Sequence, residues 1–338
     1  MNIDNELINK VKIKPLLDTL QLEDISDDDY FSKYANYISN SRLGKLKSEG
    51  AKAFFEGLKN EYSPSFEFGT LLHQRVLQPE SYEVVDGVFK PTAKAGLMAD
   101  ALYKSDGTTP TDDEIKSQSY VVGYYRDKLT ANRLSEFRQK AEPYWRDRYV
   151  YEQNNPKSDK ERIYTNKSYF QMLNSCLEAL DKNKDIQKLL HPVNEFDEEI
   201  KTYNEKTIFL DIEMTAPDCK PVVYKLKAKL DNFYITEDSI IVNDLKTTSR
   251  PVAVFDPNYY SYYREIAGYS WLLKYCADKF FNIKNPSVNG NFLVVSTIPD
   301  FATKVVSMNK KDFANGWKEY IYLLKTVAVL NQLKGYEF

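Results

Sequence analysis

The spacing of apolar residues in the first sixty residues is typical of helices. Two amphipathic segments, Val11–Leu20 and Ser39–Leu58, flank an acidic run from Glu23 to Asp29 that predicts a loop or a helix cap. Further helices are expected over Phe66–Leu77, Thr165–Leu190, Asp256–Phe281 and Asn309–Leu333. Residues from about 90 to 160 mix Gly, Thr and Asp with charged helical stretches, so we expect a helical insertion there.

Strict alternation replaces the helical spacing between residues 222 and 246. Tyr224, Leu226 and Leu230 fall on one face of the first alternating run, and Lys229 and Asp231 fall on the other. A polar cluster at residues 236–239 predicts a turn, and residues 240–246 form a second short strand. Further strands are expected at residues 287–296 and 303–308. The pattern as a whole predicts an α/β core, in which strands are flanked by helices.

The predicted hairpin brings together residues that can cleave a phosphodiester. Asp231 shares one face of the first strand with three lysines, and Asp244 and Lys246 project from a single face of the next. Mg²⁺ and Mn²⁺ take carboxylate ligands, hold a phosphate and lower the pKa of a bound water. Lys246 would then orient or activate the attacking water, or offset charge on the phosphate. The alternative is structural: Asp231 only ends a strand, and Asp244 and Lys246 form an ordinary surface pair.

A wider set of motifs gives the hairpin a family context. The residues are Gly69–His73, Asp231, Asp244–Thr248 and Tyr263–Tyr269, in that order. With them the chain resembles the PD-(D/E)XK nuclease superfamily, and within it the RecE, RecB and lambda exonuclease group, over roughly residues 66 to 297. The resemblance implies a restriction-endonuclease-like core with a mixed central sheet flanked by helices. That core would span residues 61–338 with the insertion at about 90–160, after an N-terminal helical region at residues 1–60.

The resemblance also implies further ligands. His73 would bind the metal, although a lone histidine on a partly apolar helix is often a satisfied core group. Gly69 would let a nucleic-acid backbone approach closely. A third carboxylate is expected before the hairpin, where Glu199 is favoured and Glu198 is second. Glu195 and Asp197 also compete for this role, and a solvated acidic turn is the alternative for the whole run. The other histidine, His191, is expected to end a helix.

DNA contacts are expected around the site. RecB-like nucleases have Gln-x-x-x-Tyr where this chain has Glu265 and Tyr269, which lie four residues apart on one helical face. An anionic Glu265 near a phosphate needs screening by a metal or by Arg264. The remaining candidates for DNA binding are Lys229, Thr247 and Thr248. Four tyrosines between residues 259 and 263 could stack on bases or pack against the sheet.

Composition limits these expectations. With 46 basic and 49 acidic residues, the net charge of −3 gives no global attraction to DNA, so affinity must come from a local basic strip. The candidates for this strip are Lys225, Lys227, Lys229 and Lys246. Three scattered cysteines favour a reducing compartment and exclude the four-cysteine iron–sulfur variant of this nuclease group. No signal peptide and no 18-residue apolar run is present, so we expect a cytoplasmic protein that does not enter the membrane.

Taken together, the motifs predict a Mg²⁺- or Mn²⁺-dependent deoxyribonuclease. The hairpin alone supports metal-dependent phosphodiester cleavage. The resemblance adds a double-strand DNA exonuclease that degrades one strand from an end and leaves a single-stranded tail for recombination. It also implies a partner that anneals single strands, a homo-oligomeric ring, and a phage gene expressed in a bacterial cytoplasm. The alternatives are an endonuclease of the same superfamily in restriction or repair, and a non-catalytic DNA-binding protein that keeps the fold.

Overall fold

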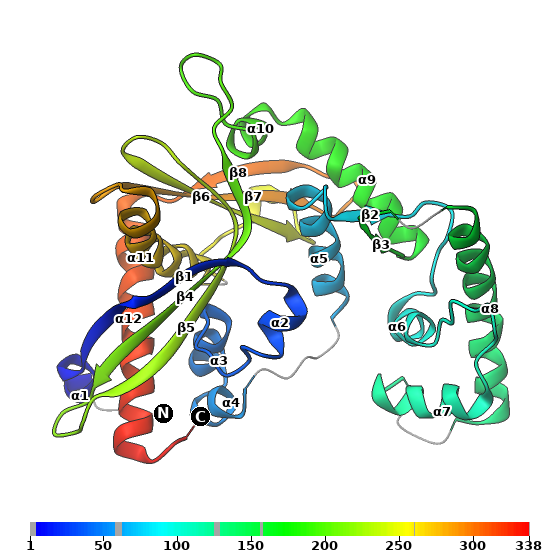
Figure 1. Cartoon of the computed structure of the whole chain (residues 1–338), viewed down its shortest axis with the longest axis horizontal. Coiled ribbons are helices and arrows are strands. Elements are labelled where there is room, and N and C mark those ends of the chain that lie inside the picture. The colour runs from blue at the N-terminus through cyan, green and yellow to red at the C-terminus, as the bar shows by residue number, and fades with distance from the viewer. Residues whose placement is uncertain (1–4, 58–62, 125–128, 156–157, 260, 338) are drawn as a thin grey trace. The chain divides into compact units, whose positions relative to one another are not determined.

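The chain divides into two compact units. The computed structural model describes residues 5–57, 63–124, 129–155, 158–259 and 261–337 (Figure 1). Unit 1 combines residues 1–60 with residues 179–338, and unit 2 comprises residues 61–178. Residues before 60 therefore share a unit with the second half of the chain, and they do not form the separate N-terminal helical region expected from the sequence.

Unit 1 is built on a mixed six-stranded sheet with the order β1-β4-β5-β6-β7-β8 (Figure 1). All neighbouring strands are antiparallel except β6 and β7, which are parallel. A parallel pair needs a crossover, and α11 supplies it between β6 and β7. The strands are β1 (Lys12–Asp24), β4 (Thr202–Thr215), β5 (Val222–Ile235), β6 (Ser239–Thr248), β7 (Ser287–Ser296) and β8 (Thr303–Ser307).

The first strand corrects a sequence prediction. Residues 11–20 were expected as an amphipathic helix, but most of them lie in β1, which pairs with β4 along the edge of the sheet. Lys12-Ile13-Lys14 and the alternation around Leu22 suit a strand. Pro15 is tolerated because an edge strand has one side without ladder bonds. Short apolar runs fit both periods, which is why the pattern was misleading.

Helices complete unit 1 and enclose its core. They are α1 (Asn5–Lys10), α2 (Asp27–Phe31), α3 (Asn40–Ser48), α4 (Ala51–Glu56), α10 (Lys184–Leu190), the short helix η1 (Val252–Val254), α11 (Tyr262–Phe281) and α12 (Lys310–Lys334). Two glycines allow α11 and α12 to pack closely. A Cβ on Gly316 would stand 2.2 Å from the carbonyl oxygen of Tyr263, and one on Gly268 would stand 2.6 Å from the Tyr320 ring.

Unit 2 is mainly helical and has its own core. Its elements are α5 (Pro64–Leu77), β2 (Tyr82–Val84), α6 (Ala93–Ala101), α7 (Asp112–Val121), α8 (Ala131–Asn154), β3 (Glu161–Ile163) and most of α9 (Lys167–Lys182). Phe137, Tyr144 and Met98 are among its most deeply buried side chains. The separate core explains why the expected insertion folds as a compact unit, which is larger than predicted and includes α5.

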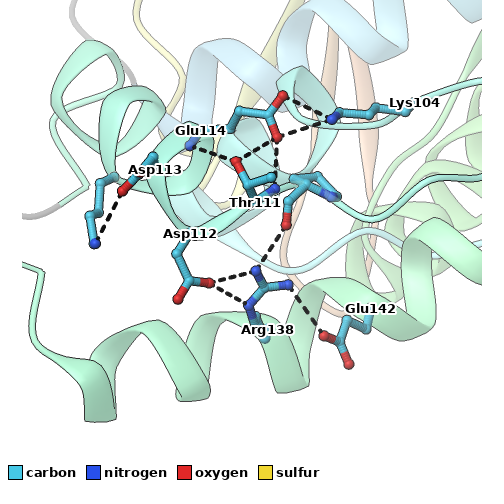
Figure 2. Close-up of polar contacts among 9 residues, drawn as sticks. Lys104, Thr111, Asp112, Asp113, Glu114, Arg138 and Glu142 are labelled. Atoms are coloured by element: carbon cyan, nitrogen blue, oxygen red, sulfur yellow. Dashed lines mark hydrogen bonds and ion pairs between the residues drawn. The ribbon is translucent and has the colours of Figure 1, made fainter.

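Paired charges hold α7 in unit 2. Figure 2 shows Thr111 at the N-cap and Glu114 closing a capping box, with Lys104 paired to Glu114. Arg138 of α8 forms an ion pair with Asp112 in the first turn of α7, at 2.6 Å between Nη2 and Oδ1. The acidic first turn also suits the positive end of the helix dipole, so this terminus is stabilised from several sides.

Most other predicted elements are confirmed. β6, β7, β8 and α12 lie within a residue or two of the expected bounds, and His191 is the C-cap of α10. Asn183 interrupts the helix expected at 165–190 by capping α10, and α11 begins at Tyr262 after a turn that follows Asp256. Among the described residues, no helix is both long enough and apolar enough to cross a bilayer.

Candidate active site

Three carboxylates form a row across the middle of the unit 1 sheet. The β4–β5 register pairs Asn204 with Asn232 and Lys206 with Leu230, which sets Glu205 opposite Asp231. The β5–β6 register begins at Asn232 and Asn243, so Asp231 is followed across the strands by Asp244. Carboxylate oxygens of Glu205 and Asp231 lie within 4.8 Å of one another. We call Glu205, Asp231 and Asp244 the carboxylate row.

Asp231 lies where β5 and β6 separate. The backbone pairing of the two strands ends at Asn232 and Asn243, and beyond that point the side chain of Asp231 accepts a hydrogen bond from the Leu245 N–H at 2.8 Å. A side-chain acceptor thus satisfies a buried backbone donor beyond the end of the β5–β6 backbone pairing. The interaction also fixes the Asp231 carboxylate next to the two residues that flank Leu245.

Asp244 is an almost completely buried carboxylate paired with one lysine. Its side chain is 3% exposed, and its Oδ2 atom lies 2.8 Å from Nζ of Lys246. Oδ2 has no aligned hydrogen-bond donor, so the contact is an ion pair without the directionality of a hydrogen bond. Burial raises the pKa of Asp244 well above its usual value, as do Asp231 and Glu265, while Lys246 opposes the rise.

Lys246 stays protonated in this setting. Burial lowers the pKa of the ammonium group, but the carboxylates of Asp244, Glu265 and Asp231 raise it further and prevail. Its Nζ atom also lies 3.5 Å from Oε2 of Glu265 and 4.8 Å from the centre of the Tyr262 ring. A protonated amine cannot accept a proton, so the arrangement favours a cation that offsets charge over a general base.

Glu265 and Tyr269 act as a pair on α11, as their spacing predicted. The Tyr269 hydroxyl donates to Oε1 of Glu265 at 2.8 Å, while Oε2 faces Lys246. Glu265 therefore has its screening cation in Lys246. Arg264, one of the two screening groups considered from the sequence, is engaged elsewhere: this side chain is buried, bonds to Asn40 and forms an ion pair with Glu319 at 2.7 Å. Arg264 ties α11 to α3 and α12, which gives it a structural role in place of the predicted DNA contact.

Glu205 was missed by sequence reasoning and carries a strained backbone. Its φ of 52° lies in the left-handed region, which is rare within a strand and costs about 1 kcal/mol or more. Its side chain is 10% exposed, and Oε2 lies 3.3 Å from Nζ of Lys229. Strain of this kind is concentrated at functional sites. The polar run around Asp218 marks the β4–β5 turn, and counting symmetrically about it would have placed Glu205 opposite Asp231.

Glu199, the carboxylate favoured from the sequence, lies elsewhere. It is exposed in the turn before β4, where it pairs with Val193, and Glu195, Asp197 and Glu198 are exposed in the same turn. β4 begins after this turn, at Thr202. The acidic run is a solvated turn, which was the alternative interpretation. The geometry therefore favours Glu205 over Glu199 as the third carboxylate.

Three of the four lysines in the expected basic strip, Lys227, Lys229 and Lys246, have partners within unit 1, whereas Lys225 is exposed. Lys227 is 3% exposed, donates to the Tyr30 carbonyl and lies over the Tyr30 ring. Lys229 forms ion pairs with Asp27 and Glu205, and Lys246 forms ion pairs with Asp244 and Glu265. Lys229 and Lys246 thus neutralise carboxylates of their own unit. Lys229 in particular supports Glu205 rather than facing outward to DNA.

The remaining candidates are distributed over both units. Gly69 and His73 lie on α5 of unit 2, where the His73 side chain is partly buried. Thr247 and Thr248 end β6, directly after Lys246, and are half-buried. The Thr248 carbonyl accepts hydrogen bonds from Thr297 of the strand end beside it. The predicted roles of these four residues in metal or DNA binding stay predictions.

The donor set fits a hard divalent cation. Four carboxylates, Glu205, Asp231, Asp244 and Glu265, gather in a largely buried space, where Lys229 pairs with Glu205 and Lys246 pairs with both Asp244 and Glu265. Buried anionic oxygens without matching donors are costly unless a cation compensates them. Oxygen-only donors of this kind are those that Mg²⁺ and Mn²⁺ prefer. The buried Oδ2 atom of Asp244, which lacks an aligned donor, is the clearest sign of such a fit.

Comparisons with known proteins give little beyond this geometry. No family model and no curated protein matches the chain. A crystal structure from Eubacterium rectale named "Putative exonuclease" is similar at a TM-score of 0.43 with 10% identity, covering 91% of this chain and 88% of that one. The crystal structure of SSO0001 is similar at a TM-score of 0.26 with 11% identity, covering 76% of this chain and 86% of that one. At TM-scores below 0.5 neither likeness bears on function, which must be argued from the site.

Proposed function

We propose that this chain is a Mg²⁺- or Mn²⁺-dependent nuclease that hydrolyses DNA. The observation that carries the proposal is the carboxylate row with a protonated lysine beside it. Glu205, Asp231 and Asp244 come from three adjacent strands, and Lys246 lies within 2.8 Å of Asp244. Carboxylates gathered in a largely buried space, next to a fixed positive charge, suit a bound metal and an anionic substrate.

Each residue of the site has a distinct role in this proposal. Asp231 and Asp244 would hold the metal, with Glu205 as the third carboxylate. The bound cation supplies a water of lowered pKa and a clamp for the phosphate. Lys246, which stays protonated, faces the charge that builds up on the phosphate. Glu265 and Tyr269 are positioning residues, because their hydrogen bond holds the carboxylate that pairs with Lys246.

The finer parts of the proposal rest on the resemblance. These are cleavage from a double-strand end, a single-stranded product for recombination, and His73 as a further ligand. Gly69, Thr247 and Thr248 as DNA contacts have the same basis, as do a ring, an annealing partner, a phage origin and a place in the bacterial cytoplasm. The site itself supports metal-dependent phosphodiester hydrolysis, which an endonuclease would share. Whether the protein cleaves DNA from an end or internally therefore has to be decided by experiment.

The test uses end-labelled linear duplex and covalently closed circular duplex, each with Mg²⁺, Mn²⁺ or a chelator. We expect the wild type to degrade the linear form only, and only with metal. Asp244→Ala and Lys246→Ala should each lower the rate by about 10²-fold to 10³-fold. Equal rates in the wild type and both variants would rule out this site. Cleavage of the circle would make the protein an endonuclease, and no cleavage by any preparation would favour a DNA-binding role.

A matched pair decides which carboxylate is the third. Glu205→Gln and Glu199→Gln make the same change on residues that lie six positions apart in the chain. Glu205→Gln should reduce cleavage by about 10-fold to 100-fold, as expected when a metal-site carboxylate is weakened. Glu199→Gln should leave it unchanged because this side chain is exposed in a turn. The reverse result would return the third position to Glu199.

A further inference from the structure

A wide apolar groove opens on the surface of unit 1, where α11, β7 and the start of α12 meet. It has a volume of about 510 Å³, and the side chains of Trp271, Phe313 and Trp317 line it. The two indole rings lie 5.4 Å apart between their centres. The charged residues that line it are Lys274 and Lys310, both exposed. An aromatic groove bordered by two ammonium groups is suited to an aromatic side chain carried on an acidic segment.

A segment with that chemistry projects from another part of the same unit. Figure 1 shows the turn between α10 and β4 standing out at the top of the view. Its tip carries Phe196, which is 74% exposed, within the sequence Glu195-Phe196-Asp197-Glu198-Glu199. All four of the acidic side chains are exposed. We call residues 193–199 the acidic knob.

Hydrogen bonds within the acidic knob hold it in one conformation before it binds a partner. The Asn194 side chain accepts hydrogen bonds from the Phe196 and Glu198 N–H groups, both at 2.9 Å, and donates to the Glu198 carboxylate. The Asn194 N–H also donates to the Glu198 carbonyl at 2.8 Å. An ordered turn that displays a large aromatic side chain loses little conformational entropy on binding.

We propose that the acidic knob of one copy of this chain docks into the aromatic groove of a second copy, with Phe196 packed against the indole rings and the carboxylates of the knob facing Lys274 and Lys310. The two surfaces are complementary in charge, each presents aromatic side chains, and both belong to unit 1. The contact joins different patches on the two copies, so association runs head to tail. Because a single turn and groove form a small interface, the association is weak and depends on salt.

Sedimentation velocity of the purified full chain, from about 1 µM to about 100 µM, tests the contact. The wild type should form larger species as its concentration rises, and high salt should reduce them. Phe196→Ser should remain a monomer over the same range. Phe66→Ser is the matched control, since Phe66 is 75% exposed on α5 and should have no effect on association. Unfolding temperatures of both variants should equal that of the wild type, because both side chains are exposed.

Charge reversal identifies the two surfaces as partners. The variant Glu195→Lys/Asp197→Asn/Glu199→Lys has a basic knob, in which Glu198 is the remaining carboxylate, and Lys274→Glu/Lys310→Glu has an acidic groove. Each alone should stay monomeric, because like charges then meet. An equimolar mixture should associate again, since each knob finds a complementary groove on the other variant. Failure of the mixture to associate would overturn the proposal, as would a wild type that stays monomeric or equal effects of Phe196→Ser and Phe66→Ser. These readouts need no DNA and no metal, so they stand or fall independently of the nuclease.

Discussion

Two rows of polar side chains cross the same strands of unit 1, one residue apart and on opposite faces. One is the carboxylate row. The other is an asparagine row in which Asn232 donates to Asn204 at 2.6 Å, Asn243 to Asn232 at 2.8 Å, and Asn291 to Asn243 at 3.0 Å. Asn232 and Asn243 directly neighbour Asp231 and Asp244, and successive residues of a strand face opposite sides.

The two rows differ in how completely their polar side-chain atoms are hydrogen-bonded. Both donor hydrogens of Asn243 are used, by Asn232 and by the Leu189 carbonyl, and its oxygen accepts from Asn291. By contrast, Oδ2 of Asp244 has no aligned donor and lies among other carboxylates. A neutral, fully bonded network stabilises the sheet by itself, whereas an anionic and incompletely bonded one lowers stability until a cation binds. The completeness of hydrogen bonding thus distinguishes the two rows of polar residues within one sheet.

The largest expected effect breaks the asparagine row. Asn243→Leu removes three hydrogen bonds and leaves buried groups of Asn232, Asn291 and Leu189 without their partner, which should lower the free energy of unfolding by about 2–4 kcal/mol. Urea unfolding measures it. Asn289→Leu on the same strand as Asn291 is the exposed control and should change stability by less than about 0.5 kcal/mol. Equal losses of stability in the two variants would mean that the asparagine row contributes no more to stability than an exposed asparagine does.

The second prediction concerns the carboxylate row. Asp244→Asn keeps the shape and removes a buried charge, so stability in a chelator should be unchanged or slightly higher. Mg²⁺ at about 100 times its dissociation constant should stabilise the wild type by about 2.7 kcal/mol and the variant far less. Thermal unfolding with and without Mg²⁺ measures both values. A variant that is destabilised in chelator, and still stabilised by Mg²⁺, would show that Asp244 is structural like its neighbour.

The smallest effect concerns Lys227, a buried charged residue that belongs to neither row. Burial lowers the pKa of Lys227 from 10.5 to about 8, with Arg42 adding to the shift. The unfolded chain therefore binds more protons than the folded one between pH 8 and 10.5. The free energy of unfolding should rise by about 2 kcal/mol from pH 7 to pH 9.5 through this residue. Lys227→Met should remove that part of the slope in urea titrations. An unchanged slope would contradict the lowered pKa.

Much of the hairpin could be predicted from local pattern. Alternation places Asp231 on one face of β5, and it sets Asp244 and Lys246 two residues apart on one face of β6. Helical spacing likewise joins Glu265 to Tyr269. These relations depend only on residues a few positions apart, which is why the sequence reveals them.

What could not be predicted depends on distant pairings. Glu205 reaches Asp231 through the register of β4, and Arg264 meets Glu319 because α11 packs on α12. The lysines of β5 appear basic in sequence, but Asp27 and Tyr30 of α2 engage Lys229 and Lys227. No local periodicity encodes such partners. The strand β1 was misjudged for a related reason, since a short apolar run fits two periods until its neighbour is known.

The carboxylate row takes its dimensions from the sheet. Adjacent strands are spaced about 4.7–4.9 Å apart, and this spacing, rather than any loop, sets how far apart the oxygens can be. Residues could be inserted in the β4–β5 or β5–β6 turns without moving Glu205, Asp231 or Asp244. Removing one residue inside a strand would turn its carboxylate to the other face. The turns can therefore change in length without disturbing the carboxylate row, whereas β4, β5 and β6 cannot lose a residue beside it without breaking it.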